Sequence, residues 1–126
     1  MTPKINFGII GCSSVAKNSF IPALLKTNHA VLESVGSRSI SKSKFIAQKL
    51  HCKNFGNYDD VLENKKIDAV YISLPIALQE KWIMKAAKAG KHILCEKSST
   101  TSYHSAQKIV KECKKNGVRI MENFSF

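Results

Sequence analysis

The stretch that decides the fold is Gly8-Ile9-Ile10-Gly11-Cys12-Ser13-Ser14-Val15-Ala16. It completes the apolar run Ile5–Ile10, which is typical of a strand buried on both faces of a sheet. A helical pattern follows over residues 15–26. A strand, a glycine turn and a helix in this order favour a domain that binds a nucleotide at the turn.

Three positions in this stretch match the pattern G-x-G-x-x-G/A, namely Gly11, Ser13 and Ala16. Gly11 allows the tight turn and Ala16 allows close packing of helix on strand. Backbone N–H groups at Ser13, Ser14 and Val15 are expected to hold a pyrophosphate, helped by the helix dipole. Ser13 departs from the pattern, because glycine there lets the backbone approach the phosphates, whereas serine adds bulk and a hydroxyl donor.

Strand and helix patterns alternate along the whole chain. Strands are expected at Ile5–Ile10, Val31–Ser37, Asn54–Phe55, Asp68–Leu74 and Lys91–Glu96, with a last strand beginning at Val118–Met121. Helices are expected at 15–26, Ser41–Leu50, Tyr58–Glu63, Ala77–Ala89 and Ser102–Asn116, with Pro22 kinking the first helix or delaying its start. This alternation predicts an α/β fold, a doubly wound parallel sheet formed by residues 1–126 as one domain.

Composition agrees with one globular domain that lies in the cytoplasm. Hydrophobic residues make up 44% of the 126 residues and charged residues 23%. The sequence contains neither a signal-peptide pattern nor an apolar run near the roughly 20 residues of a membrane span. The four cysteines form no C-x-x-C pair, so we expect free, buried thiols and no metal site.

The formal net charge of +11 raises the question of nucleic acid. Arg38 and Arg119 are the only arginines, although arginine is the usual reader of base edges. The lysines are scattered, and aromatic residues do not alternate with them as base stacking requires. We therefore expect a solvated lysine-rich surface, part of whose field serves an anionic cofactor, and no nucleic-acid partner.

The second expected strand ends in Ser37-Arg38-Ser39, where a domain selective for NAD usually carries Asp or Glu for the ribose 2′-hydroxyl. No acidic residue is present there. Arg38 and the nearby Lys42 instead suit the 2′-phosphate of NADP, and the serines can donate hydrogen bonds to it. We expect NADP to be preferred over NAD; the alternative is an ordinary surface arginine in a loop.

Five segments in order resemble the Gfo/Idh/MocA oxidoreductase family. They are residues 8–12, 36–38, 68–75, 89–97 and 121–124, and the most specific is Ala-Gly-Lys-His-Ile-Leu-Cys-Glu-Lys at 89–97. The resemblance implies an N-terminal Rossmann domain followed by a second domain built on a large open sheet, in a homo-oligomer. It also implies hydride transfer between nicotinamide and a hydroxyl-bearing carbon of a sugar, inositol or related polyol.

The resemblance also assigns site residues. Glu96-Lys97 matches the family's Glu-Lys-Pro motif, which implies that Lys97 is catalytic beside the nicotinamide and that Glu96 lies near its ribose. A lysine there can polarise the substrate oxygen or relay a proton. Leu74 and Pro75, at another strand end, and Asn123 complete the expected cofactor contacts. Without the family match, a solvated loop lysine would be the simpler interpretation of Lys97.

The chain departs from the family pattern at three further positions. Ser98 replaces the proline of the Glu-Lys-Pro motif, and Ile76 and Gln79 stand where many members have Asn and His. These departures support an alternative function, a nucleotide-binding module without catalysis that has a regulatory or scaffold role. The residues that contact substrate in the family belong to the second domain, so we expect the 126-residue chain by itself to be inactive.

Overall fold

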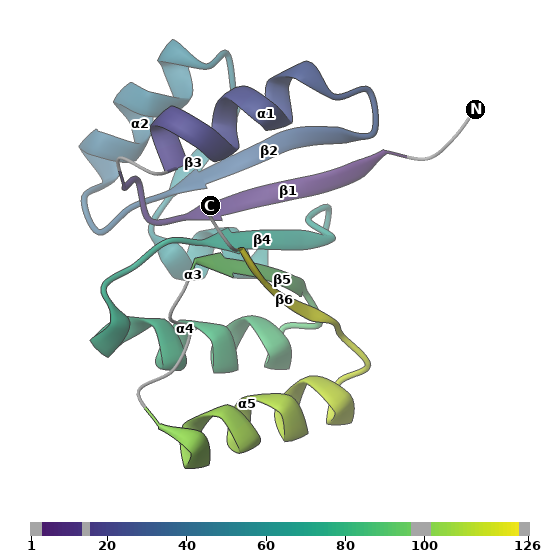
Figure 1. The fold of residues 1–126 in the computed structure, drawn as a ribbon. Coiled ribbons are helices and arrows are strands. Elements are labelled where there is room, and N and C mark those ends of the chain that lie inside the picture. The colour runs from purple at the N-terminus through teal and green to yellow at the C-terminus, as the bar shows by residue number, and fades with distance from the viewer. Residues whose placement is uncertain (1–3, 14–15, 97–101, 124–126) are drawn as a thin grey trace.

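Short apolar runs form the strands, because both faces of a parallel sheet are covered by helices. The computed structural model describes residues 4–13, 16–96 and 102–123, without the side chains of Lys17 and Asn123. The strands are β1 (Ile5–Ile10), β2 (Ala30–Gly36), β3 (Asn54–Gly56), β4 (Ala69–Ile72), β5 (His92–Glu96) and β6 (Ile120–Asn123). The helices are η1 (Ala16–Phe20), α1 (Ile21–Lys26), α2 (Ile40–Lys49), α3 (Tyr58–Glu63), α4 (Ile76–Lys88) and α5 (Tyr103–Lys115) (Figure 1).

The described strands form one parallel sheet in the order β3-β2-β1-β4-β5-β6. From β1 the chain builds outward through β2 to β3, then crosses back to place β4 on the other side of β1. The carboxyl ends of β1 and β4 therefore lie at the point where the strand order reverses, which is where such sheets bind ligands. This topology confirms the predicted doubly wound α/β fold.

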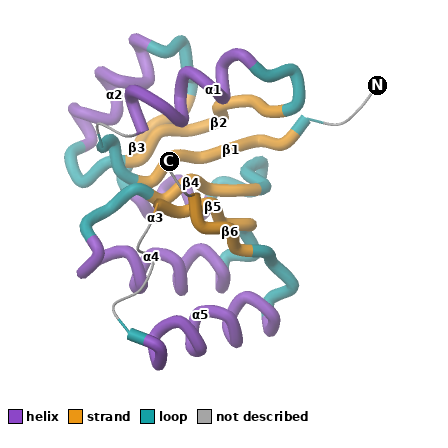
Figure 2. The backbone as a smooth tube through the Cα atoms, in the orientation of Figure 1, coloured by secondary structure: helices purple, strands orange, loops and turns teal. Residues whose placement is uncertain are grey.

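Helices cover the sheet on both faces. Figure 2 shows α1 and α2 on one side of the sheet and α4 and α5 on the other. The larger core lies under α3, α4 and α5, and its fully buried members include Val61, Val70, Ile72 and Ile83. The smaller core joins β2 to α2 through Val35, Ile46 and Ala47.

The first helix is interrupted, as Pro22 predicted. Residues Ala16–Phe20 form a π-helical turn, and the α-helix begins only at Ile21, with Pro22 in its first turn. Proline fits there because the missing N–H has no partner in a first helical turn anyway. The strand expected over Asp68–Leu74 is shorter, since β4 ends at Ile72 and leaves Ser73 and Leu74 outside the strand.

The other helix ends lie within one or two residues of their predicted positions. Side chains of Ser39, Asn57 and Ser102 accept the N–H groups that open α2, α3 and α5. Gly90, the residue directly after the helix expected at Ala77–Ala89, has a φ of +77°. Glycine adopts this left-handed conformation at no steric cost, so it ends the helix cleanly.

A buried lysine stands at the entrance to β5. Lys91 is 6% exposed, and its ammonium group donates to the carbonyls of Asn64 and Ile67, each at 2.8 Å. Burial lowers the pKa of this lysine, and the nearby Asp68 carboxylate opposes that shift. The two hydrogen bonds fix the loop between α3 and β4.

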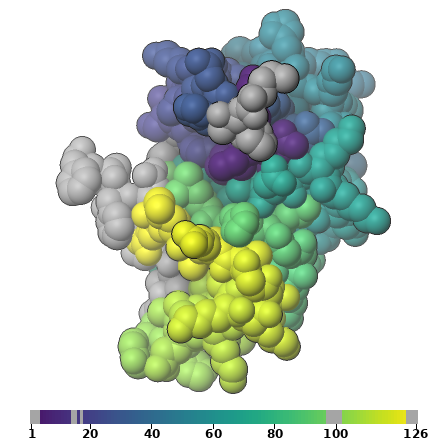
Figure 3. All heavy atoms as spheres, turned by 90° about the vertical axis from the view of Figure 1, so that its right-hand side faces the viewer, coloured from purple at the N-terminus to yellow at the C-terminus, as the bar shows by residue number. Residues whose placement is uncertain are grey.

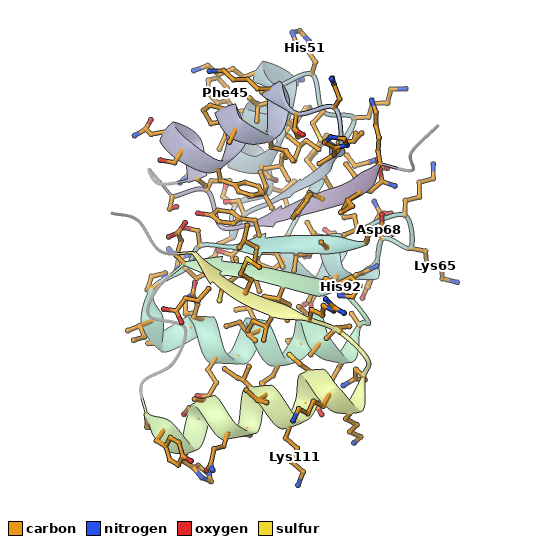
Figure 4. The ribbon with its side chains drawn as sticks, turned by 45° about the vertical axis from the view of Figure 1, so that its right-hand side comes forward. Phe45, His51, Lys65, Asp68, His92 and Lys111 are labelled. Carbon is orange, nitrogen blue, oxygen red and sulfur yellow. The ribbon has the colours of Figure 1, made fainter. Side chains whose placement is uncertain are left out.

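Other lysines lie on the surface of the domain. Lys65, before β4, and Lys111, on α5, point away from the body of the domain (Figure 4). Figure 3 shows the side at which the strands begin, where β1 and β6 both reach the surface.

The four cysteines are free, as predicted, but Cys12 and Cys52 are only half-buried. Within the described residues, no helix is long and apolar enough to cross a membrane.

Candidate functional site

A cleft of about 280 Å³ opens at the carboxyl ends of β1, β2 and β4. Three strands that are far apart in the sequence reach it because parallel strands all end at the same edge. Its lining includes the predicted residues Gly11, Ser13, Ser37, Arg38, Ser39, Lys42, Leu74 and Pro75. The structure thus brings together most of the cofactor-binding residues expected from the sequence.

Gly11 forms the floor of the turn after β1. Its φ is +95°, and a Cβ built on it would lie 2.4 Å from the Ser73 carbonyl oxygen and 2.8 Å from the Leu74 side chain. Side chains other than hydrogen are therefore excluded twice, by the backbone conformation and by the adjacent end of β4. This close approach is the physical reason for the first glycine of the pattern.

Ser13, the departure from the glycine pattern, is held by two hydrogen bonds. Its hydroxyl oxygen accepts the N–H of Ala16 at 3.1 Å and shares a hydrogen bond with the Ser73 hydroxyl. The first contact satisfies an N–H at the start of η1, as helix-capping serines do. The second contact crosses from the end of β1 to the end of β4.

The start of α2 forms the basic end of the cleft. Ser39 caps the helix by accepting the N–H of Lys42 at 3.3 Å, and Ser37 accepts the N–H of Ser39 at the same distance. Arg38 and Lys42 are exposed cations at this helix N-terminus. Helix N–H groups, two cations and serine hydroxyls in one place suit a phosphate group.

Three residues that line the cleft were not predicted as site residues: Cys12, Tyr58 and Ser73. Cys12 lies between two residues of the glycine pattern, and Ser73 directly follows β4, so position alone could have identified both. Tyr58 opens α3, just after the end of β3. Burial raises the pKa of Tyr58, and the positive charge of Arg38 acts in the opposite direction, so these two side chains share one electrostatic environment.

Glu96 lies at the end of β5 and is not among the described residues that line the cleft. Its carboxylate accepts the phenol O–H of the fully buried Tyr71. Burial raises the pKa of Tyr71, and so does the hydrogen bond to the negative Glu96. The ring of Phe20 stacks on the ring of Tyr71, with 4.0 Å between the two ring centroids. The Glu96 carboxylate is therefore held by the phenol of Tyr71, whose ring is itself fixed by packing against Phe20.

Gln79 has a different role from the one its position in the sequence suggested. It is 1% exposed, accepts the N–H of Leu74 at 3.0 Å and donates to the carbonyl of Glu96 at 2.8 Å. One amide on α4 thus joins the carboxyl ends of β4 and β5. Ile76, the other departure in this segment, is 44% exposed at the start of α4.

Some predicted residues fall outside the structural description. Ser14, Val15, Lys97 and Ser98 lie outside the described residues. The backbone of Asn123 belongs to β6 and pairs with Glu96, so the two residues lie side by side at the sheet edge. Within 4–13, 16–96 and 102–123, no cluster of His, Cys, Asp or Glu could hold a metal ion.

The parallel sheet and the cleft at its switch point define a Rossmann domain built to bind a dinucleotide. Comparison with known proteins gives the family: residues 5–124 match the one described as "Oxidoreductase family, NAD-binding Rossmann fold". The chain belongs to this Gfo/Idh/MocA family, as its sequence motifs indicated.

Relatives within the family modify sugars. The chain is 34% identical over 122 residues to a dTDP-3,4-didehydro-2,6-dideoxy-alpha-D-glucose 3-reductase of Streptomyces violaceoruber, covering 97% of this chain and 36% of the relative. It is also 34% identical over 121 residues to the D-xylose 1-dehydrogenase (NADP(+)) 2 of Haloferax volcanii, covering 95% and 37%.

A solved structure shows the same fold. It is a 3-ketoreductase from Actinomadura kijaniata in complex with TDP-benzene and NADP, with a TM-score of 0.92 and 33% identity over 96% of this chain and 38% of that one. The chain therefore spans between a third and two fifths of the length of these relatives.

Proposed function

We propose that this chain is the cofactor-binding domain of an NADP-dependent oxidoreductase that transfers a hydride between nicotinamide and a carbon of a sugar or related polyol. The observation that carries the proposal is the cleft, where the glycine turn and a basic helix N-terminus meet at the switch point of the sheet. In the family pattern, residues 1–126 are one domain, and a second domain supplies substrate contacts.

The charge of the cleft favours NADP over NAD. Arg38 and Lys42 are the charged residues among its described lining, and no carboxylate is present there to accept the ribose 2′-hydroxyl. A 2′-phosphate would gain charge-assisted hydrogen bonds from Arg38 and from the serine hydroxyls at the start of α2. The D-xylose dehydrogenase of Haloferax volcanii is named for NADP(+), and the 3-ketoreductase of Actinomadura kijaniata was solved with NADP; both support this choice.

The nicotinamide end is assigned to the ends of β5 and β6. Glu96 and Asn123 are neighbours there, and Lys97 follows Glu96 in the sequence. When bound, the cofactor supplies or accepts the hydride. We assign to Lys97 the role of holding the reacting oxygen of the substrate or moving its proton, and to Glu96 the orientation of the nicotinamide ribose. Tyr71 and Gln79 fix Glu96 from two sides.

The test is to titrate the chain with NADPH and with NADH and to measure binding by calorimetry or by cofactor fluorescence. NADPH is expected to bind at least tenfold more tightly than NADH, because hydrogen bonds to charged groups contribute about 1.5–3 kcal/mol each. Arg38→Ala is expected to abolish most of that difference.

Arg119→Ala is the matched control, since it removes the same charge from the start of β6, away from the cleft. It is expected to leave the ratio of the two affinities unchanged. Equal affinities for NADPH and NADH in the unchanged chain would overturn the NADP assignment, and failure to bind either cofactor would overturn the proposed function.

A further inference from the structure

Ser13 occupies the position at which glycine normally lets a pyrophosphate approach the backbone. Its side chain therefore needs a defined direction if the cofactor is to bind. The Ser13 hydroxyl accepts the N–H of Ala16 on one side and shares a hydrogen bond with the Ser73 hydroxyl on the other. Both serines line the cleft, and Ser73 is 7% exposed. The Ser13 side chain is thus drawn toward the end of β4.

The Ser13–Ser73 pair adjoins a second polar pair, formed by Tyr71 and Glu96. The oxygen of Ser13 accepts from Ala16, and in the hydrogen bond between Ser13 and Ser73 either hydroxyl can be the donor. Ser73 lies beside the phenol of Tyr71, and Tyr71 donates to the carboxylate of Glu96. Neighbouring hydrogen bonds reinforce one another, so the contact between Ser13 and Ser73 is part of a wider polar network at the end of β4.

We propose that Ser73 is a positioning residue of the pyrophosphate loop, whose hydroxyl holds Ser13 against the wall of the cleft so that a serine can stand in the place of glycine. The proposal rests on the proposed binding of a dinucleotide. It assigns to Ser73 a function that exists only because position 13 is not glycine. The opposite arrangement, in which Ser13 donates directly to the phosphates, would make Ser73 a competitor for that hydroxyl.

A double-mutant cycle distinguishes the two arrangements. The unchanged chain, Ser73→Ala, Ser13→Gly and the double variant are titrated with NADPH. Ser73→Ala is expected to weaken binding about two- to tenfold, the range that corresponds to one net hydrogen bond. In the Ser13→Gly background, the same substitution is expected to change the affinity by less than about twofold, because no hydroxyl at position 13 remains to be held.

Two small probes show where the change acts. Inorganic pyrophosphate, competing with NADPH, is expected to bind Ser73→Ala more weakly than the unchanged chain. Adenosine 2′-phosphate is expected to bind both equally, because Arg38 and Ser39 lie at the other end of the cleft, on the start of α2. A general loosening of the structure would instead weaken both probes. Ser73→Thr retains the hydroxyl and is expected to restore NADPH binding.

The outcomes separate the inference from the function on which it rests. If the unchanged chain binds NADPH and Ser73→Ala binds it equally or more tightly, the positioning role is wrong and the proposed function stands. Equal losses from Ser73→Ala with serine and with glycine at position 13 also overturn the positioning role. If the unchanged chain binds no dinucleotide, both the function and the inference are overturned.

Discussion

Gly11→Ala is the substitution whose cost is best defined by the structure. A φ of +95° costs a residue with a Cβ about 1–2 kcal/mol. The new methyl group would also lie 2.4 Å from a backbone oxygen of Ser73, which cannot rotate away, and such overpacking costs about 1–3 kcal/mol. We expect a total loss of about 2–5 kcal/mol, a large part of the roughly 5–15 kcal/mol that stabilises a domain.

Gly117→Ala is the matched control, since its φ is +66° and a Cβ there meets nothing within 4 Å. It incurs the conformational cost alone, so urea unfolding is expected to show about 1–3 kcal/mol less destabilisation than for Gly11→Ala. NADPH binding should fall only in Gly11→Ala, because Ser73 and Leu74 line the cleft and must move. Equal destabilisation of the two variants, with cofactor binding intact in both, would refute this reasoning.

Two further predictions concern stability. Gln79→Leu removes the hydrogen-bond partner of the Leu74 N–H and of the Glu96 carbonyl, so we expect the free energy of unfolding in urea to fall by about 2–4 kcal/mol. The control Gln107→Leu changes an exposed glutamine and should lower that free energy by less than about 0.5 kcal/mol. Similar costs for the two substitutions would contradict the bridging role of Gln79. Burial raises the pKa of the Cys113 thiol above its ordinary 9.0 in the folded chain. Its contribution to stability is therefore complete below 9.0, the pKa of the unfolded chain, and is lost as the pH rises from there through the higher pKa of the folded chain. Cys113→Ala should flatten the fall in unfolding free energy as the pH is raised above 9.0, and an unchanged slope would exclude this thiol.

The sequence predicted the fold well because the apolar periods of strands and helices alternate along it, with glycines at several of the turns. Gly11 and Gly90 each act through local backbone geometry, which a short stretch of sequence reveals. The π-helical turn before Ile21 was not predicted in that form, since Pro22 shows only that a regular helix cannot run through it.

The candidate site was predicted where residues follow a strand directly, and missed where contacts between strands decide. Gln79 reads in the sequence as a lost polar contact, yet it joins the ends of β4 and β5, a pairing that requires the tertiary structure. Tyr58 belongs to the cleft because β3 ends beside β2. The hydrogen bond between Ser13 and Ser73 spans 60 residues of sequence, so no local pattern could reveal it.

The buried Lys91 gives the domain an internal reporter of local opening. It is the only buried lysine among the residues that the structure describes, and its nitrogen faces two carbonyl groups instead of water. An amine-reactive reagent in excess should label exposed lysines such as Lys65 and Lys111 at once. Lys91 can react only when the loop before β4 detaches, so its rate of labelling, read by mass spectrometry, measures how often that segment opens while the rest of the chain stays folded.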